Sequence, residues 1–484
     1  MTADHSPTTV RFTFEGRDVE AKAGQTLGGA LHADGVRILT RSFKYRRPRG
    51  YTCGYGACGN CPLTVDGLPG VNACERPVEG GEDVRRERGW PSAGADVFRA
   101  ADLAAPLLTA GFQFRLFTKT PWLAHRAERV MAWVAGAGRL PAPHAAAAVR
   151  ATTAESRDVD VVVVGGGLSG LAASLGAADE GAAVLLVHRG ALGGRALGRP
   201  GSTGVRDVAS RSDRDAALAL ARRVEGHPGV EVLDGTAVAT FDGVDLIVVS
   251  QGRRIAVTAP SMVVATGSYD VPMSFAGNDK PGVMLASAVR RLMHVERVRP
   301  GRRAVVVTED ASGYEITREL LDAGVSVTAV VDPDARTRPP ALAAPLAAAR
   351  VPVLAARPEK VRGLRGVRSL LVRGADGTRR LRSDLVVVCR PERPAEELRW
   401  QRHYVEAGDT QAPKGSPTAA LSDTTVVVGS AAGLPAQTVQ DSSESGRRAA
   451  RAARATAGPR AAAGARTAGA TRVCRHDASD TQTP

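Results

Sequence analysis

The sequence predicts an α/β protein in which a small N-terminal unit precedes two interleaved Rossmann-like domains. Four cysteines and several glycines gather within the first 74 residues. A buried strand, a glycine-rich turn, a helix and a second apolar strand follow within residues 158–190. A similar strand–helix–strand pattern recurs about 140 residues later, over 302–331.

The composition is that of an ordinary globular protein. Of 484 residues, 43% are hydrophobic and 24% are charged. The formal net charge is +14, but eight arginines and two aspartates from Arg447 onward place about +6 of it in a low-complexity segment. We expect residues 451–484 to form a disordered basic tail. No nucleic-acid binding is expected, because no recognition helix or RNA-binding signature accompanies the charge.

No targeting or membrane-spanning segment is expected. The stretch MTADHSPTTV has neither a basic nor an apolar signal region, and no apolar run is long enough to span a bilayer. A cytoplasmic location is therefore predicted. Six cysteines in such a chain indicate metal or redox use rather than disulfides, and Cys389 and Cys474 are interpreted as incidental.

The first 85 residues predict a hairpin, a helix, a loop and a second hairpin. Apolar and polar residues alternate over 10–14 before the turn EGR. Thr26 is a candidate N-cap for a helix in TLGGALHADGV. Asp66–Gly67 is the expected turn between the two strands of the second hairpin.

The four N-terminal cysteines have the spacing of a plant-type [2Fe–2S] ligand set. Four, two and twelve residues separate Cys53, Cys58, Cys61 and Cys74 in turn. The glycines between the first three permit positive φ, so backbone N–H groups can turn toward the sulfurs. We therefore predict a β-grasp-like [2Fe–2S] ferredoxin domain with these four cysteines as cluster ligands.

Two alternatives fit the cysteines less well. Zinc prefers two Cys-x2-Cys pairs or Cys/His pairs, and only one x2 pair occurs here. A Cys-x-x-Cys redox motif would leave Cys53 and Cys74 unexplained.

A dinucleotide-binding turn is predicted at residues 165–170. Gly165, Gly166, Gly167 and Gly170 follow the apolar strand Val159–Val164 and open a helix, which is the context that such a turn requires. The first glycine makes the turn, the third lets the backbone approach a pyrophosphate, and the last permits close helix–strand packing. The helix N-terminus then faces the phosphates. The expected cofactor is FAD, with NAD as the alternative.

The strand that follows lacks the usual acidic residue. VLLVHRG supplies His188 and Arg189 where a carboxylate commonly binds the adenosine ribose. A histidine can still bond a ribose hydroxyl, and an arginine there can meet a 2′-phosphate or face solvent.

Three further segments are candidate cofactor contacts. Gly193 and Gly194 lie in LGGRA, which resembles a loop near the flavin of two-domain disulfide reductases. ATG, with Thr266 and Gly267, resembles the segment where their chain returns beside the cofactor. In VVVGSAAG, Gly429 precedes Ser430, at a position where many flavoproteins carry an aspartate.

The second strand–helix–strand has no glycine triplet, so we predict a degenerate nucleotide-binding domain over 281–390. The other predicted segments are a ferredoxin-like domain (1–85), a connector (86–157) and an FAD/NAD-binding domain (158–280 and 391–450). The stretch RSFKYRRPRG is either a solvated loop or a site that docks a partner or clamps phosphates.

These motifs together resemble the alpha-subunit family of heteromeric sarcosine oxidases. Related subunits of hydrogen cyanide synthase, opine oxidases and proline or hydroxyproline dehydrogenases are similar. The resemblance runs from FTFEGRDVEAKAGQTLGGALHADGV through RSFKYRRPRG, WPS, AGFQFRLF, the glycine turn and TEDASGYE to VVVGSAAG. It implies an alpha chain that holds FAD or NAD, and a beta subunit that oxidises a small amine or imino acid with its own flavin. Sarcosine oxidase alpha chains continue into an aminomethyltransferase-like folate domain, which we do not find here, so folate chemistry is not expected.

The resemblance and the motifs predict a [2Fe–2S]- and FAD-containing oxidoreductase that passes electrons between flavin and cluster. No residue stands out as a general base, which agrees with a substrate site in a partner. The alternative is a non-catalytic electron-transfer or assembly subunit that binds NAD or no dinucleotide. A third hypothesis is a zinc-containing binding protein, which only the cysteines support.

Overall fold

The computed structural model divides the chain into two compact units. It describes residues 9–102, 126, 129–133, 140–150, 153–198, 213–239, 246–250, 252–401, 425–432 and 439–457. Unit 1 comprises Met1–Ala146 and Asp270–Glu392, and unit 2 comprises Ala147–Tyr269 and Arg393–Pro484. The cysteine segment and the second strand–helix–strand therefore belong to the same unit.

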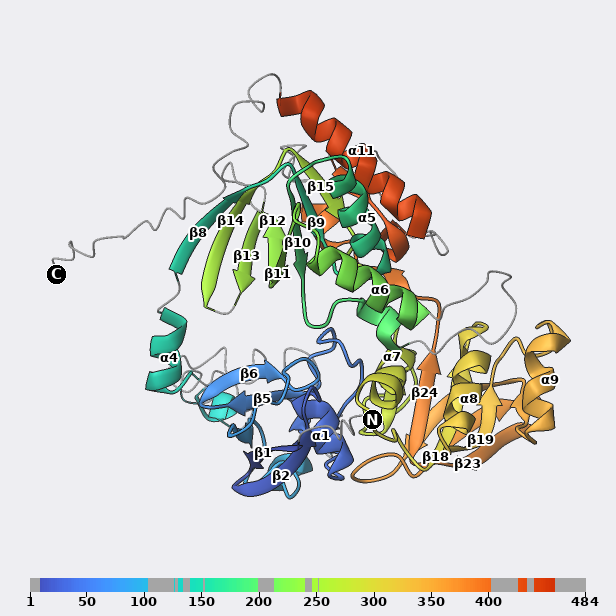
Figure 1. Cartoon of the computed structure of the whole chain (residues 1–484). Coiled ribbons are helices and arrows are strands. Elements are labelled where there is room, and N and C mark those ends of the chain that lie inside the picture. The colour runs from blue at the N-terminus through green and yellow to red at the C-terminus, as the bar shows by residue number, and fades with distance from the viewer. Residues whose placement is uncertain are drawn as a thin grey trace, which may run out of the picture. The chain divides into compact units, whose positions relative to one another are not determined.

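The N-terminal part of unit 1 is a mixed five-stranded sheet with one helix packed into its core (Figure 1). Strand order is β2-β1-β7-β5-β6, and only the β1–β7 pair is parallel. The strands are β1 (Thr9–Phe14), β2 (Arg17–Lys22), β5 (Pro62–Val65), β6 (Leu68–Asn72) and β7 (Asp83–Arg86). Helix α1 (Leu27–Ala33) begins as predicted, because the Thr26 hydroxyl accepts a hydrogen bond from the Gly29 amide at 3.1 Å. Both predicted hairpins are confirmed.

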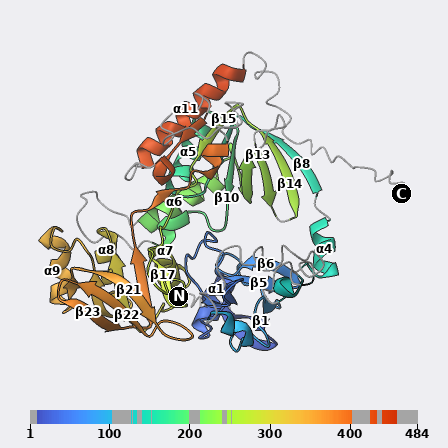
Figure 2. The ribbon, with the colours of Figure 1, turned by 180° about the vertical axis from the view of Figure 1, so that it is seen from behind.

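The second part of unit 1 is a parallel sheet with strand order β17-β24-β18-β19-β20. Its strands are β17 (Val283–Leu285), β18 (Arg303–Thr308), β19 (Ser326–Val331), β20 (Val353–Leu354) and β24 (Leu385–Cys389). Its helices are α7 (Ala286–Arg290), which continues as a π-helical turn η3 (Arg291–Val295), α8 (Ser312–Asp322) and α9 (Pro340–Ala348). A three-stranded antiparallel meander, β21 (Ala356–Arg362), β22 (Ser369–Gly374) and β23 (Gly377–Arg382), completes this part, which Figure 2 shows from behind.

One hydrophobic core runs through both parts of unit 1. Phe12 and Leu31 of the N-terminal part belong to the same buried cluster as Val283 and Val305 of the parallel sheet. Short strands β3 (Thr40–Arg41) and β4 (Pro48–Arg49), the 3-10 helix η1 (Val97–Asp102) and helix α4 (Pro143–Arg150) lie outside these sheets.

Unit 2 is built around a parallel sheet with strand order β11-β10-β9-β15-β26. Its strands are β9 (Val161–Val164), β10 (Val184–His188), β11 (Val230–Asp234), β15 (Ser261–Val264) and β26 (Thr425–Val427). One face packs on helices α5 (Leu168–Asp179), α6 (Asp213–Glu225) and α11 (Val439–Ala457), and α11 lies along α5 in Figures 1 and 2. The other face packs on a second sheet of β12 (Thr236–Ala239), β13 (Leu246–Ser250), β14 (Arg253–Thr258) and β8 (Thr153–Asp158). Two short strands, β16 (Ser268–Tyr269) and β25 (Arg393–Pro394), pair with each other, and 3-10 turns η2 (Gly194–Gly198) and η4 (Gly429–Ala432) follow β10 and β26.

The predicted α/β class is confirmed in both units. Residues 153–158, expected to belong to the connector, form strand β8 of unit 2. Residues 451–457 of the expected basic tail end helix α11. The remainder of that tail, Cys474 and the segment AGFQFRLF lie outside the described residues.

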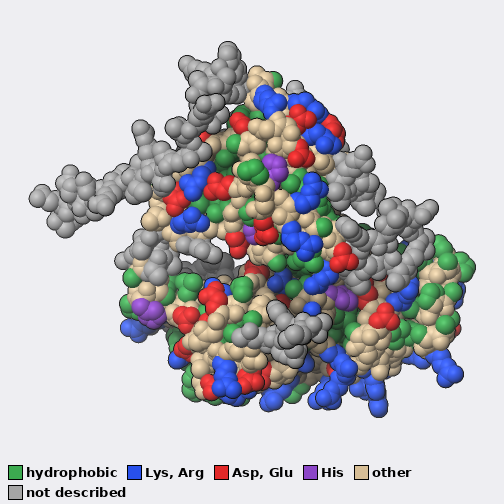
Figure 3. Space-filling model, in the orientation of Figure 1, with side chains coloured by type: hydrophobic (Ala, Val, Ile, Leu, Met, Phe, Trp, Pro, Cys, Tyr) green, Lys and Arg blue, Asp and Glu red, His purple; other side chains and the backbone are tan. Residues whose placement is uncertain are grey.

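The described surface carries charges of both signs. Figure 3 shows Lys and Arg side chains interspersed with Asp and Glu on the face in view. Across the described helices, none combines the length and the apolar character needed to cross a bilayer.

Candidate functional site

The four predicted cluster ligands come together in unit 1. The Cys53 thiol lies within hydrogen-bonding reach of the Cys58 and Cys74 thiols, and Cys74 is similarly close to Cys61. Cys53, Cys61 and Cys74 are 5%, 2% and 1% exposed, and Cys58 is partly buried. Three thiols of one loop and the Cys74 thiol, which follows β6, thus lie close together and are largely buried, as expected of the ligands of a binuclear cluster. Within the described ranges, no three His, Cys, Asp or Glu side chains are arranged as a single-ion site.

Backbone amides of the cysteine loop point at the sulfurs. The Gly56 amide donates to Cys74 Sγ at 3.2 Å. The amides of Tyr55 and Cys58 lie close to the Cys53 sulfur. Together with the nearby Cys58 and Cys74 thiols, which contribute most, they lower the pKa of the Cys53 thiol. The same side-chain contacts, together with burial, raise the pKa of the Cys58 and Cys74 thiols, so the thiolate, the form that binds iron, is favoured at Cys53.

The structure explains why glycine occupies position 56. Its φ is +70°, and a Cβ placed there would lie 1.9 Å from Glu75 Oε2. The positive φ of the turn that presents the Gly56 amide to sulfur therefore favours glycine, and a larger residue would also have to displace the Glu75 carboxylate.

The cysteine loop is fastened to helix α7 of the same unit. Ser287 Oγ donates to the Cys53 carbonyl at 3.0 Å, and the Leu285 amide donates to the Thr52 carbonyl at 2.9 Å. A Cβ on Gly54 would lie 3.0 Å from the Ala288 Cα, so the two backbones are in close contact. These contacts join the loop to a segment more than 230 residues later in the chain.

A buried carboxylate fixes the start of α1 against the same segment. Glu296 accepts hydrogen bonds from the Thr26 amide and hydroxyl, both at 2.9 Å, and from Arg291 Nε at 3.2 Å. Glu296 is 2% exposed, so its charge is satisfied by these three donors. The Arg291 guanidinium also lies over the Tyr55 ring, 5.1 Å from its centroid, which places a cation beside the cysteine loop.

The glycine turn of unit 2 has the geometry of a phosphate cradle. Gly165 has φ +117°, and a Cβ there would lie 2.1 Å from the Ala265 carbonyl oxygen. A Cβ on Gly170 would lie 1.8 Å from the Gly165 carbonyl oxygen, so helix α5 packs directly on the turn. Gly167 is the N-cap of α5, and a Cβ there would meet nothing within 4 Å. The open space therefore lies at the helix N-terminus, where a pyrophosphate binds in this type of turn.

His188 ends strand β10 beside this turn. A Cβ on Gly166 would lie 2.7 Å from the His188 Cβ, which explains the extra glycine. His188 Nδ1 is buried and has no hydrogen-bond partner among the described residues. An orphaned buried nitrogen at the end of the second strand is suited to a ribose hydroxyl. Arg189 is exposed and lies near Tyr269. Burial and Glu397 raise the pKa of the Tyr269 phenol, and Arg189 opposes this rise.

The other candidate contacts gather at the same edge of the sheet. The Gly193 amide donates to the Gly166 carbonyl at 2.7 Å, and Gly194 has φ +55°. Arg195 Nη1 donates to the Ser268 carbonyl at 2.9 Å, which ties the 193–198 turn to the segment after β15.

The candidate residues that follow β15 and β26 have different roles, and they are Thr266, Gly267, Gly429 and Ser430. Thr266 Oγ1 donates to the Ala395 carbonyl at 2.8 Å, so this hydroxyl holds the returning chain. Gly267 has φ +81° with open space around its Cα. Gly429 has φ +66°, a Cβ there would lie 2.5 Å from Ser169 Oγ, and Ser430 is exposed.

The sequence interpretation missed Asp234. This residue ends β11 directly opposite His188, and its Oδ1 accepts from the Gly190 amide at 3.1 Å. The pattern VEVLD, an apolar strand that ends in aspartate, was the available signal. Ser287, Arg291 and Glu296 offered no such signal, because only tertiary packing brings them to the cysteine loop.

The polar groups of the second strand–helix–strand form hydrogen bonds with neighbouring residues of the same chain. Asp332 ends β19, where a ribose-binding acid commonly stands, and is fully buried. It accepts from Tyr314 Oη and Arg338 Nε, each at 2.9 Å. In the preceding turn, Asp310 Oδ1 accepts from the Ser312 amide at 3.0 Å. The groups that would meet a nucleotide are thus already satisfied by the chain.

Part of the basic stretch RSFKYRRPRG is structural. Arg46 Nε donates to Asp96 Oδ2 at 2.9 Å, and Arg41 Nε donates to the Ala93 carbonyl at 2.6 Å. Both arginines and Asp96 are almost fully buried. Arg49 pairs with Asp279 at 2.9 Å.

Comparison with known proteins agrees with this architecture. Residues 7–89 match the 2Fe-2S iron-sulfur cluster binding domain, and residues 159–414 match the pyridine nucleotide-disulphide oxidoreductase family. The sarcosine oxidase alpha subunit of Rhizobium meliloti (strain 1021) is 33% identical over 341 residues, which are 66% of this chain and 34% of that protein. A hydrogen cyanide synthase subunit of Pseudomonas aeruginosa is 38% identical over 74 residues, 15% of this chain and 70% of that protein.

The solved structures support the fold. L-proline dehydrogenase from P. horikoshii superposes with a TM-score of 0.61 at 21% identity, covering 93% of this chain and 73% of that one. The chain spans about a third of the length of the sarcosine oxidase alpha subunits that it matches.

The fold and the two sites define an iron–sulfur oxidoreductase with a dinucleotide-binding core. Within that class, the chain belongs to the pyridine nucleotide-disulphide oxidoreductase family, with an N-terminal 2Fe-2S cluster binding domain. The resemblance to sarcosine oxidase alpha, hydrogen cyanide synthase and opine oxidase subunits is confirmed.

Proposed function

We propose that this chain is the [2Fe–2S]- and FAD-containing electron-transfer subunit of a heteromeric enzyme that oxidises a small amine or imino acid. The observation that carries the proposal is the convergence in unit 1 of four thiols, three of them buried and one partly buried, with the Gly56 amide donating to Cys74. Bound together, a flavin and a [2Fe–2S] cluster would convert a two-electron oxidation into single-electron transfer.

The residues around the thiols fit such a cluster. Cys53, Cys58, Cys61 and Cys74 would hold the irons as thiolates. The Gly56 amide, and the amides that reach Cys53, would stabilise negative charge on sulfur. Burial of the thiols keeps water from the centre.

The residues around the glycine turn fit a dinucleotide. The α5 N-terminus at Gly167 would face the diphosphate, and His188 Nδ1 would bond a ribose hydroxyl. FAD is proposed over NAD because the 193–194 and 266–267 segments resemble flavin-side loops of two-domain disulfide reductases. The internally satisfied Asp332 supports a second domain that binds no nucleotide.

The relatives support the proposed partner and substrate class. The matched proteins are named as subunits of sarcosine oxidase, hydrogen cyanide synthase and opine oxidase. We therefore expect a flavin-containing beta subunit that carries the amine- or imino-acid site. A non-catalytic electron-transfer or assembly subunit is the alternative, favoured by the missing ribose carboxylate at His188 and by Ser430.

The test is the identity of the dinucleotide that the purified chain retains. The protein is purified anaerobically and denatured, and the released nucleotide is separated by chromatography and quantified against protein. About one FAD per chain supports the proposal. NAD, or no dinucleotide, with an intact cluster would establish the alternative.

A further inference from the structure

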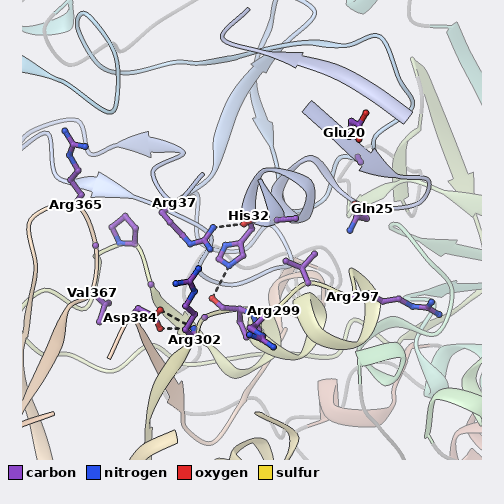
Figure 4. Close-up of a pocket in the computed structure, with 18 of the residues that line it drawn as sticks. Glu20, Gln25, His32, Arg37, Arg297, Arg299, Arg302, Arg365, Val367 and Asp384 are labelled. Carbon is purple, nitrogen blue, oxygen red and sulfur yellow. Dashed lines mark hydrogen bonds between the residues drawn. The ribbon is translucent and has the colours of Figure 1, made fainter. Parts of the chain in front are cut away.

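A basic groove lies within unit 1, between the N-terminal part and residues 281–384 (Figure 4). Its volume is about 1020 Å³. Seven cationic side chains line it, namely Lys22, Arg37, Arg297, Arg299, Arg302, Arg365 and Arg368. Only two carboxylates, Glu20 and Asp384, stand among them. In Figure 4 the labelled arginines extend along the groove from Arg365 at one end to Arg297 at the other.

Both carboxylates of the groove already have partners. Glu20 Oε1 accepts from Arg11 Nη2 at 2.7 Å. Asp384 Oδ1 accepts from the backbone amides of Arg302 and Arg303, at 3.0 and 2.8 Å. By contrast, no ion pair joins any of the seven cationic side chains to a carboxylate of the described residues. The groove therefore carries a net positive charge, although the Asp384 carboxylate acts electrostatically on Arg37.

The segment 296–300 is held so that its arginines must face outward. Glu296, Val298 and Pro300 are buried, whereas Arg297 and Arg299 between them are exposed. The buried positions are anchored: Gln25 Nε2 donates to the Glu296 carbonyl at 2.8 Å, and His32 Nε2 bonds the Pro300 carbonyl at 3.0 Å. Arg297 adopts φ +56°, uncommon for a non-glycine residue. This rigid display lowers the entropy cost of binding an anion.

The groove suits an acidic polypeptide better than a small phosphate compound. Its arginines are exposed along an open surface, whereas nucleotide pockets enclose most of their ligand. The amides of Arg302 and Arg303 are occupied by Asp384, so they cannot cradle a phosphate. Leu364 at the same groove is 71% exposed, and an apolar side chain among arginines is typical of protein interfaces.

We infer that this groove is a docking site for a partner polypeptide rich in Asp and Glu. Carboxylates of the partner would pair with arginines from both walls, and an apolar side chain would cover Leu364. The inference does not depend on the identity of the dinucleotide or on the oxidation chemistry.

The test uses the full-length protein and a fluorescent peptide of about eight glutamates, read by anisotropy. The groove variant is Arg299→Glu/Arg302→Glu, and the control is Arg336→Glu/Arg379→Glu, which reverses two exposed arginines of unit 1 outside the groove. ATP serves as a competing small polyanion. Circular dichroism and visible absorption verify that each variant is folded.

The wild type and the control should bind the peptide with equal affinity, weakened by added salt. The groove variant should bind at least about tenfold more weakly, since each replacement turns an attraction for the peptide into a repulsion. Equal losses in both variants, or no binding by the wild type at low ionic strength, would overturn the inference. Stoichiometric ATP binding that displaces the peptide would overturn it in favour of a small polyanion site.

Discussion

The hydroxyl of Ser287 donates a hydrogen bond to the backbone carbonyl of Cys53 at 3.0 Å. Ser287 lies in α7, directly after a strand of the parallel sheet, and Cys53 begins the cysteine loop. The bond therefore joins the predicted cluster site to a rigid element of the second nucleotide-type sheet. Asp270 Oδ2 accepts a hydrogen bond from the Ser287 amide at 2.8 Å and also contacts the Ser287 hydroxyl, so this hydroxyl is held between the Asp270 carboxylate and the Cys53 carbonyl.

Replacing Ser287 by alanine should loosen the cysteine loop. Loss of one buried hydrogen bond costs about 1 kcal/mol, and the Cys53 carbonyl is left without this donor. We expect visible absorbance to decay several-fold faster in the presence of an iron chelator. The control is Ser326→Ala at the exposed start of β19. Equal decay rates in the two variants would show that the contact does not protect the site.

We expect Cys74, but not Cys389, to be a ligand of the cluster. Cys74→Ser should abolish the visible absorption and the EPR signal of the dithionite-reduced protein, because one thiolate of four is lost. Cys389 is equally buried, but it ends β24 and is interpreted as incidental. Cys389→Ala should keep both signals. A cluster that survives in Cys74→Ser would remove this residue from the ligand set.

Two glycines of the same turn should respond differently to alanine. A Cβ on Gly167 meets no atom within 4 Å, so Gly167→Ala should fold normally and yet bind dinucleotide at least about tenfold more weakly, because the methyl group occupies the phosphate space. A Cβ on Gly170 overlaps a backbone oxygen, so Gly170→Ala should lower stability by about 1–3 kcal/mol. Thermal melts and nucleotide content measure the two effects. Full dinucleotide content in Gly167→Ala would contradict the proposed phosphate position.

His32 should make unit 1 less stable in mild acid. Burial, with a smaller contribution from Arg37, lowers the pKa of His32 from 6.5 to about 4, and hydrogen bonds to the backbone and the charge of Asp384 oppose this shift. Between these values the unfolded chain binds a proton that the folded chain does not, so stability is full above about pH 6.5 and falls toward pH 4. The loss from about pH 7.5 to about pH 5 should be about 2 kcal/mol.

Urea unfolding at these two pH values measures this dependence. His32→Gln keeps a side-chain donor for the Pro300 carbonyl but does not titrate, so its stability should change less over the same interval. An identical pH dependence in the wild type and the variant would assign the acid sensitivity to other groups.

Local sequence patterns were sufficient where the chemistry is local. The cysteine spacing, the Thr26 cap and the glycine turn each lie within about 20 residues, and the structure brings each set together. The same was true of the departure at His188, whose orphaned nitrogen marks the place where a carboxylate usually stands.

The sequence patterns could not predict contacts between segments that are distant in the chain. Ser287 and Glu296 reach the cysteine loop and α1 across more than 230 residues, and neither lies in a recognisable motif. The basic groove could not be predicted either, because its cationic side chains come from four separate segments and form a single charged surface only after folding. Packing of the N-terminal part and residues 270–392 into one unit is the cause of both.

The most direct test of the central claim is the visible absorption spectrum of anaerobically purified protein before and after dithionite, with iron and sulfide determined on the same sample. We predict about two irons and two sulfides per chain, broad [2Fe–2S] bands that bleach on reduction, and a flavin shoulder that bleaches with them. A colourless protein with zinc at the four cysteines would contradict the account.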